Sequence, residues 1–284
     1  MTNAPRMVAS RDGTLIAVFS SGDAAVDTRP LILVHGTASD HLTFRIAGPL
    51  LALRRRIHAI DRRGRGASGD APDGYAIEHE FEDVVAVADA VAADNGSTVD
   101  VLGHSFGGRC ALGAALLTRS IRRIVCYEGA PPRDLDAASA YEPAWLMAAL
   151  RDDLARGDLE ALLEQFMRTV VRFDDDAMAR FRADPVWPLR VASAATILRE
   201  LSASNDPAAG LERMARVTAP VLQVLGTTSP PAFAANVAAL NARLPDGRIV
   251  AIEGAAHAAH HSHPDAFVPA VETFLDAPLD PPRD

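Results

Sequence analysis

The sequence predicts an α/β protein: a mostly parallel central sheet flanked by helices, with a helical segment inserted after the sixth strand. In the first half of the chain, short apolar runs alternate with helix-like stretches, which is typical of a parallel sheet. Residues 131–217 have helical periodicity and contain no convincing strand. The alternation returns at Pro220. Residues 1–130 and 218–284 are therefore the predicted core, and residues 131–217 are a predicted helical domain.

The predicted strands are short runs rich in Val, Ile and Leu. Asp12 and Gly13 separate the first two runs, and Asp-Gly between apolar runs favours a hairpin. Pro30–Val34 is apolar throughout, as in a strand buried on both faces. In chain order, the predicted strands are Met7–Ala9, Leu15–Phe19, Pro30–Val34, Arg56–Ile60, Val99–Leu102, Ile121–Tyr127, Pro220–Leu225 and Arg248–Ile252.

The predicted helices follow the 3.6-residue period of their apolar side chains. In the core they are Phe44–Leu53, Glu78–Ala93, Phe106–Thr118, Phe233–Leu244 and Asp265–Phe274. In the helical domain they are Pro143–Arg156, Leu159–Val171, Asp175–Arg182 and Val191–Ala203. The acidic run at residues 174–176 is expected to cap a helix and face water rather than to bind a metal.

Composition narrows the class of protein. The chain has 284 residues, is 49% hydrophobic, and has a formal net charge of −9, which argues against disorder and against a general nucleic-acid binder. We find no secretory signal and no apolar run long enough to span a membrane, so we expect a soluble cytoplasmic protein, monomer or homodimer. Cys110 and Cys126 are expected to be small core residues, because two cysteines give no disulfide framework.

The segment Gly103-His104-Ser105-Phe106-Gly107 fits the pattern Gly-x-Ser-x-Gly between an apolar strand and a helix. This context is typical of a nucleophile elbow, a tight strand-to-helix turn in which small residues must flank the strained serine. The serine hydroxyl then lies above the sheet edge, at a helix N-terminus that favours negative charge. Ser105 is the predicted nucleophile; the alternative is a small-residue turn that only packs helix against strand.

A serine nucleophile needs a base, which is expected after a later strand. His257 is the first histidine after the strand Arg248–Ile252 and is therefore the predicted base. The histidines 260, 261 and 263 follow closely, but the nearby carboxylates give no recognisable metal-ligand spacing. We expect these three at a helix start and on the surface, and we expect no metal and no cofactor.

Four motifs resemble the α/β-hydrolase superfamily: His35-Gly36 after a central strand, the segment 61–66 after the next, the serine turn at 103–108, and the segment 254–257. The resemblance covers nearly the whole chain, with residues 131–217 in place of the lid domain. It implies the α/β-hydrolase fold and a lidded serine hydrolase similar to esterases, lactonases and thioesterases. Dehalogenases and epoxide hydrolases fit poorly, because they use an aspartate as nucleophile.

The acid of a catalytic triad departs from the common pattern of that superfamily. The loop 226–231, where the acid usually lies, contains no carboxylate, and Asp246 is expected at the wrong end of the sheet. Some α/β-hydrolases place the acid after the strand that follows the nucleophile helix, and Glu128 stands there. We predict Glu128 as the acid. The alternatives are a hinge residue that pairs with an arginine, or a Ser–His dyad in which Ser229 or water orients His257.

Acyl transfer also needs hydrogen-bond donors for the developing oxyanion. One predicted donor is the backbone N–H of Phe106, the residue after the nucleophile. By resemblance, the second is the N–H of Thr37, which follows His35-Gly36. The arginine-rich segment that begins at Asp61 is interpreted as a structural turn rather than a phosphate site, since it lacks P-loop spacing.

The predicted function is a serine hydrolase that cleaves a carboxylic ester, lactone or thioester through an acyl-enzyme on Ser105. Aromatic and Met residues of the helical domain, among them Trp145, Phe166 and Trp187, favour a mainly apolar pocket and a small, uncharged substrate. The alternatives are a C–C bond hydrolase or perhydrolase with the same triad, or a non-catalytic protein that binds a small molecule. No nucleic-acid or membrane partner is expected.

Overall fold

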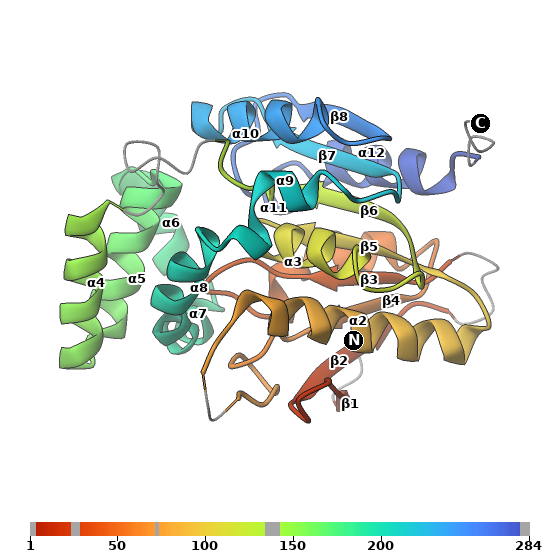
Figure 1. Cartoon of the computed structure of the whole chain (residues 1–284). Helices are drawn as coiled ribbons and strands as arrows, with labels where there is room; N and C mark the ends of the chain where they lie inside the picture. The colour runs from red at the N-terminus through yellow and green to blue at the C-terminus, as the bar shows by residue number, and fades with distance from the viewer. Residues whose placement is uncertain (1–3, 24–28, 72–73, 134–142, 279–284) are drawn as a thin grey trace.

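The computed structural model describes residues 4–23, 29–71, 74–133 and 143–278. Its centre is one eight-stranded sheet in the order β1-β2-β4-β3-β5-β6-β7-β8 (Figure 1). The β1–β2 and β2–β4 pairs are antiparallel and all other pairs are parallel, which confirms the prediction of a mostly parallel sheet. The strands are β1 (Arg6–Ala9), β2 (Leu15–Ser21), β3 (Leu31–Val34), β4 (Ile57–Ile60), β5 (Val99–His104), β6 (Ile121–Tyr127), β7 (Val221–Gly226) and β8 (Gly247–Ile252).

Both faces of the sheet are covered, and β3 shows why its sequence is apolar throughout. Successive side chains of a strand point to opposite faces. Leu31 and Leu33 pack into the apolar cluster on one face, whereas Ile32 and Val34 pack into the cluster on the other. All four are fully buried. A parallel strand with helices on both sides has no solvent-facing positions, and polar residues at this point would lose their hydration.

The helices of the core divide between the two faces. The cluster that contains Ile32 also contains side chains of α2, α3, α9 and α10, and the opposite cluster contains side chains of α1 and α12. In Figure 1, α2 and α3 lie in front of the sheet. The core helices are α1 (Ala47–Leu51), α2 (Ile77–Asn95), α3 (Phe106–Ala115), α10 (Pro231–Asn241), α11 (Ala259–Ser262) and α12 (Pro264–Asp276).

Between β6 and β7 the described residues form helices and turns only, as predicted. Most of these helices gather at one end of the sheet (Figure 1) around an apolar cluster of their own, which includes Leu146, Leu163 and Ile197. We call α4 to α9 the helical insertion. Its helices are α4 (Ala144–Arg156), α5 (Leu159–Phe166), α6 (Asp175–Arg182), α7 (Trp187–Ser193), α8 (Ile197–Ser204) and α9 (Leu211–Met214).

One predicted helix of the insertion is wrong in its extent. The sequence predicts a continuous helix over Val191–Ala203, but α7 and α8 are separated by a 3₁₀ turn over Ala194–Thr196. The hydroxyl of Ser193 donates to the Leu189 carbonyl, and that of Thr196 donates to the Ser193 carbonyl. Side-chain hydroxyls that bond to the local backbone compete with the helical ladder, which explains the break.

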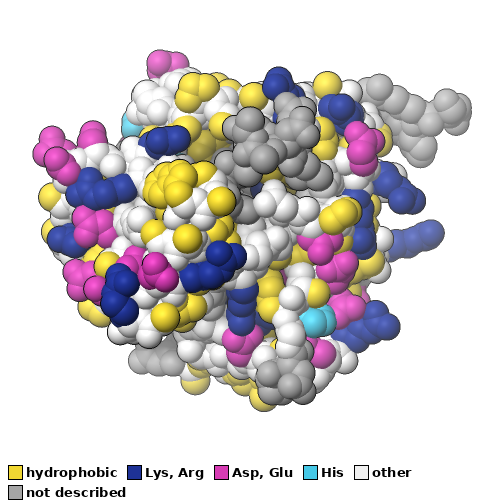
Figure 2. Space-filling model, turned by 60° about the vertical axis from the view of Figure 1, so that its left-hand side comes forward, with side chains coloured by type: hydrophobic (Ala, Val, Ile, Leu, Met, Phe, Trp, Pro, Cys, Tyr) yellow, Lys and Arg dark blue, Asp and Glu magenta, His cyan; other side chains and the backbone are white. Residues whose placement is uncertain are grey.

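The surface carries charges of both signs. On the face in Figure 2, arginine side chains are interspersed with aspartate and glutamate side chains, and no area of that face is positively charged alone. None of the helices in the described part of the chain combines the length and apolarity that a membrane crossing requires.

Candidate active site

Ser105 lies at a sharp turn between β5 and α3. Its backbone has φ 54° and ψ −126°, a conformation that costs a non-glycine residue about 1–3 kcal/mol. The surroundings hold this turn: the Ser105 N–H donates to the Tyr127 carbonyl at 2.8 Å, and the Gly108 N–H donates to the Ser105 carbonyl at 2.9 Å. A Cβ at Gly107 would overlap the Val34 carbonyl, so the turn can pack against β3 only with glycine there.

Glu128 follows β6 and is buried, with a positive φ of 47°. One carboxylate oxygen, Oε1, accepts the Gly226 N–H at 2.7 Å and the Ser229 hydroxyl at 2.6 Å. The other, Oε2, lies 2.5 Å from Nδ1 of His257. Each oxygen of this buried carboxylate therefore has a hydrogen-bond donor. The two donors to Oε1 hold the carboxylate so that Oε2 points toward the imidazole of His257.

His257 comes from the loop between β8 and α11. Because its Nδ1 faces a carboxylate, the proton of the neutral ring lies on Nδ1 and the Nε2 lone pair is left to act as a base. The ring stacks on Phe233, with centroids 4.7 Å apart and planes 26° apart. Nε2 of His104 donates to the His257 backbone carbonyl at 2.7 Å. The loop is thus fixed by its backbone as well as by its side chain.

The side chains of Ser105, Glu128 and His257 line one small cavity of about 60 Å³, together with Thr37 and Phe106. The five residues predicted for the site therefore meet at the carboxyl ends of the strands, the usual place for a ligand in this sheet topology. The remaining lining residues include Phe166, Val170 and Leu201 of the insertion.

Thr37 and Phe106 line this cavity, and each has a backbone N–H group. Over the residues that the structure describes, neither N–H donates to another part of the chain. Gly36 brings the first of these groups close to the serine: a Cβ on Gly36 would stand 3.0 Å from Cβ of Ser105. Two unengaged N–H groups beside a serine hydroxyl are the arrangement that an oxyanion requires.

A larger cleft of about 1080 Å³ adjoins this cavity and shares His257 and Phe233 with it. Its walls come from the helical insertion and from the loop after β7. Val170 and Val171, which line both spaces, belong to a π-helical turn, Met167–Val171, that continues α5. π-Helical turns are rare and are frequently found at functional sites.

The histidines around His257 differ from the expectation in one respect. The sequence predicts His260 at the surface, but it is 1% exposed and packs against His104, Tyr127 and Phe44. The prediction is wrong because the start of α11 packs against β6, where the N–H of Ala259 donates to the Tyr127 hydroxyl at 2.7 Å. Burial lowers the pKa of His104 and of His260 well below the ordinary histidine value, so both rings are neutral.

The remaining candidates have structural surroundings. Asp246 precedes β8, where its carbonyl accepts the N–H of Val221 at the start of β7, so it lies at the end of the sheet away from Ser105. Asp61 closes its turn by accepting the N–H groups of His41 and Ala67. Asp174 caps α6 by accepting the N–H of Ala177, as predicted. Among the described residues, no group of three or more His, Cys, Asp or Glu side chains is placed to hold a metal ion.

Two residues of the site have roles that differ from the sequence prediction. Ser229 is an alternative direct partner of His257 by sequence, but its hydroxyl binds Glu128 instead. His104 has no predicted role beyond its place in the serine motif, yet it holds the His257 carbonyl. For Ser229, the sequence signal is a hydroxyl in the loop after β7 of a chain whose candidate acid, Glu128, follows β6.

The sequence matches the alpha/beta hydrolase family over residues 31–270, and the chain belongs to that family. The prediction of an α/β-hydrolase fold and enzyme is confirmed. The chain is 28% identical over 267 residues to a pimeloyl-[acyl-carrier protein] methyl ester esterase of Neisseria meningitidis serogroup A, covering 89% of this chain and 79% of that one.

Two further likenesses agree with this family. An alpha/beta hydrolase of Sphaerobacter thermophilus superposes with a TM-score of 0.78 and 30% identity, over 95% of this chain and 99% of that one. A 2-(acetamidomethylene)succinate hydrolase of Mesorhizobium japonicum is 27% identical over 259 residues, 87% of this chain and 88% of that one.

Proposed function

We propose that this protein cleaves a carboxylic ester, lactone or thioester of a small, mainly apolar substrate through an acyl-enzyme on Ser105. The observation that carries the proposal is the Glu128–His257 pair, 2.5 Å from Oε2 to Nδ1, which lines the same cavity as the strained serine. The similarity to a methyl ester esterase supports ester cleavage over other hydrolyses.

In the first half of the reaction, Nε2 of His257 accepts the Ser105 proton as the serine oxygen attacks the substrate carbonyl carbon. The N–H groups of Thr37 and Phe106 stabilise the oxygen that becomes negative. Glu128 keeps the proton on Nδ1 and stabilises the imidazolium that forms. His257 then protonates the leaving alcohol or thiol, which departs and leaves the acyl group on Ser105.

In the second half, His257 removes a proton from water as the water oxygen attacks the acyl carbon. The tetrahedral intermediate collapses, the acid product leaves, and the proton returns to Ser105. Glu128 is buried and held by the Gly226 N–H and the Ser229 hydroxyl, so it orients His257 throughout without leaving its place.

The helical insertion is proposed to act as the lid domain that shapes the substrate site. Phe166, Val170 and Leu201 supply apolar walls next to the serine, and Trp145 and Phe173 line the wider cleft. Such walls favour an acyl or aromatic group over a highly charged one.

The test is labelling by a fluorophosphonate probe, with the site located by mass spectrometry, and a screen of p-nitrophenyl esters, lactones and thioesters. Wild-type protein is expected to label at Ser105 and to turn over at least one of these classes, and Ser105→Ala to do neither. A folded wild-type protein that neither labels nor hydrolyses any of them contradicts the proposal and favours a binding protein.

A further inference from the structure

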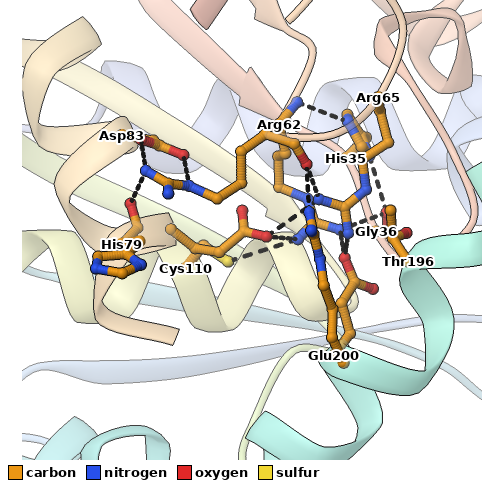
Figure 3. A network of polar contacts seen from close by, with 12 residues as sticks. His35, Gly36, Arg62, Arg65, His79, Asp83, Cys110, Thr196 and Glu200 are labelled. Carbon is orange, nitrogen blue, oxygen red and sulfur yellow. Dashed lines mark hydrogen bonds and ion pairs between the residues drawn. The ribbon is translucent and has the colours of Figure 1, made fainter. Parts of the chain in front are cut away.

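A cluster of fully buried charges lies beside the oxyanion site. We call Arg62, Arg65, Glu80 and Glu200 the Arg62 cluster, and Figure 3 shows Arg62, Arg65 and Glu200 close together. Every one of the four side chains is 0% exposed. Arg62 and Arg65 follow β4, Glu80 lies on α2, and Glu200 lies on α8 of the insertion. Two positive and two negative charges balance, which is the condition under which buried ions are tolerated.

The side chain of Arg62 contacts the peptide group that contains one of the two proposed oxyanion donors, the Thr37 N–H. Its Nη2 donates to the Gly36 carbonyl at 2.9 Å, and Nδ1 of His35 donates to the same oxygen at 2.8 Å. The Gly36 carbonyl and the Thr37 N–H belong to one planar peptide, in which the two groups point in opposite directions. Donors that fix the oxygen therefore also fix the direction of the Thr37 N–H, toward the cavity.

Arg62 also contacts the residue that supplies the other donor. Its guanidinium lies 4.9 Å from the centre of the Phe106 ring. Phe106 is the first residue of α3, directly after Ser105, and lines the same cavity. One side chain thus contacts both the Gly36–Thr37 peptide, at the Gly36 carbonyl, and the ring of Phe106. Its charge polarises the Gly36–Thr37 peptide, so that the Thr37 N–H is a stronger donor.

Arg62 is itself held in place by three groups. Nη2 donates to Glu200 at 2.6 Å, Nη1 lies 3.2 Å from Glu80, and the backbone N–H of Arg62 donates to Nε2 of His35 at 3.0 Å. Burial is the largest single effect and opposes the charged form of Arg62, but Glu80 and the other neighbouring groups together outweigh it, and the pKa of Arg62 is raised above its ordinary value. Arg62 therefore remains a fixed cation at every pH at which the protein is folded.

We infer that Arg62 is a positioning residue for the oxyanion hole, and that Glu200 of the helical insertion holds it in its working position. The inference rests on the proposed acyl chemistry and goes beyond it, because Arg62 touches neither the serine nor the acid. It also assigns the helical insertion a second role. Besides lining the pocket, its helix α8 supports the two oxyanion donors through Glu200.

The test uses a charge-balanced double variant, Arg62→Met with Glu200→Gln, which removes one charge of each sign. We expect kcat for a p-nitrophenyl ester to fall ~10- to 100-fold, since small displacements of catalytic groups cost up to ~10²-fold. KM should change less than ~3-fold. Affinity for a trifluoromethyl ketone, which forms an oxyanion on the serine, should fall by about the same factor as kcat/KM.

The matched control is Arg63→Met with Asp83→Asn. This neighbouring pair is also buried and hydrogen-bonded, at 2.7 Å, but touches neither Gly36 nor Phe106. It should lower the unfolding temperature while kcat stays within ~3-fold of wild type. If both double variants fold and lose the same factor in kcat, or if the first keeps wild-type kcat and ketone affinity, the inference is overturned.

Should the first double variant fail to fold, Arg62→Lys is measured in its place. Lysine keeps the charge but lacks the planar fork that reaches Gly36 and both glutamates together, so the same proportional losses are expected. Wild-type values in Arg62→Lys overturn the inference. A wild-type protein that neither labels with fluorophosphonate nor turns over an ester overturns the proposed function, and the inference with it, whereas labelling with no Arg62 effect overturns the inference alone.

Discussion

Two buried polar clusters flank Ser105, and they differ in how they can act. The Glu128 cluster, formed by Glu128, Gly226, Ser229 and His257, lies at the end of β6 and contains one carboxylate with neutral donors around it. The Arg62 cluster lies on the other side, beyond β3 at the end of β4, and contains four charges.

On the proposed mechanism, the difference separates proton transfer from positioning within the site. In the Glu128 cluster one oxygen of the acid faces a ring that can gain and lose a proton. The Arg62 cluster contains arginines paired with glutamates, so it can only impose a fixed field and a fixed position. On the proposed mechanism, buried charge beside Ser105 takes part in proton transfer in one cluster and not in the other, and the first three of the following predictions test that separation.

The largest effect is expected from Glu128→Gln. The amide still fills the space and accepts the Gly226 N–H, but it no longer stabilises the imidazolium or the required tautomer. We expect kcat to fall by ~10³ to 10⁴, as for comparable triad changes. Steady-state turnover of one p-nitrophenyl ester measures it. The control is the matched change Glu200→Gln, which should lower kcat less than ~10-fold. Equal losses of kcat in the two variants would contradict the proposed difference between the two clusters.

A large effect on stability is expected from Glu200→Ala. It leaves Arg62 and Arg65 in a dry site with Glu80 as their remaining carboxylate. Removing one partner of a buried ion pair costs ~3–5 kcal/mol, and urea denaturation measures the loss. The control is Glu164→Ala, whose partly exposed pair with Arg168 at 3.0 Å should contribute ~1 kcal/mol or less. Similar losses in both variants would contradict the assignment of the Arg62 cluster as structurally essential.

A smaller effect on catalysis is expected from Ser229→Ala. Glu128 loses one donor to Oε1 and keeps the Gly226 N–H, so its carboxylate is less firmly oriented. A hydrogen bond to a charged group contributes ~1.5–3 kcal/mol, and we expect about a tenfold lower kcat with KM nearly unchanged. Ser262→Ala, which removes a hydroxyl that binds the Ala258 carbonyl, serves as the control and should behave as wild type. Wild-type kcat in Ser229→Ala would show that Gly226 alone orients the acid.

A further effect concerns stability at acidic pH and lies outside both clusters. Burial lowers the pKa of His58 to about 4, whereas an unfolded histidine titrates near ~6.5. Between these values the unfolded chain binds the extra proton, so the stabilisation is present above pH ~6.5 and is lost as pH falls toward ~4. We expect His58→Gln to reduce the loss of unfolding free energy between pH 7.5 and 5.0 by about 2 kcal/mol. Denaturation curves at the two pH values measure it, and an unchanged difference would contradict the assignment of His58 as a buried neutral ring.

The sheet, and the meeting of Ser105, Glu128 and His257 at one cavity, are predictable from the sequence because their signals are local. Apolar runs mark each strand, and the glycines around Ser105 are required by close backbone contact at Val34. Glu128 is accessible to sequence reasoning because the loop after β7 contains no carboxylate and a glutamate follows β6. The surface position predicted for His260 is wrong, since nothing near it in sequence indicates the aromatic residues that cover it.

The Arg62 cluster could not be predicted in the same way. Arg62 and Glu200 are separated by 138 positions, and each stands in a stretch with an ordinary local interpretation, a glycine-rich turn and an amphipathic helix. Their pairing depends on where the helical insertion packs against the core. A buried ion pair across two such distant segments gives no spacing in the sequence, so only the tertiary structure reveals it.

The position of Glu128 after β6 has a consequence for attempts to alter which substrates the enzyme accepts. Thr228, Pro230 and Pro231 follow β7 and line the wide cleft, yet none of them binds Glu128 or His257. In a related chain whose catalytic acid lies in the loop after β7, randomising that loop would destroy turnover in most clones. Here a library confined to these three codons can alter the wall of the wide cleft without replacing Ser105, Glu128, His257 or the residues that bind Glu128.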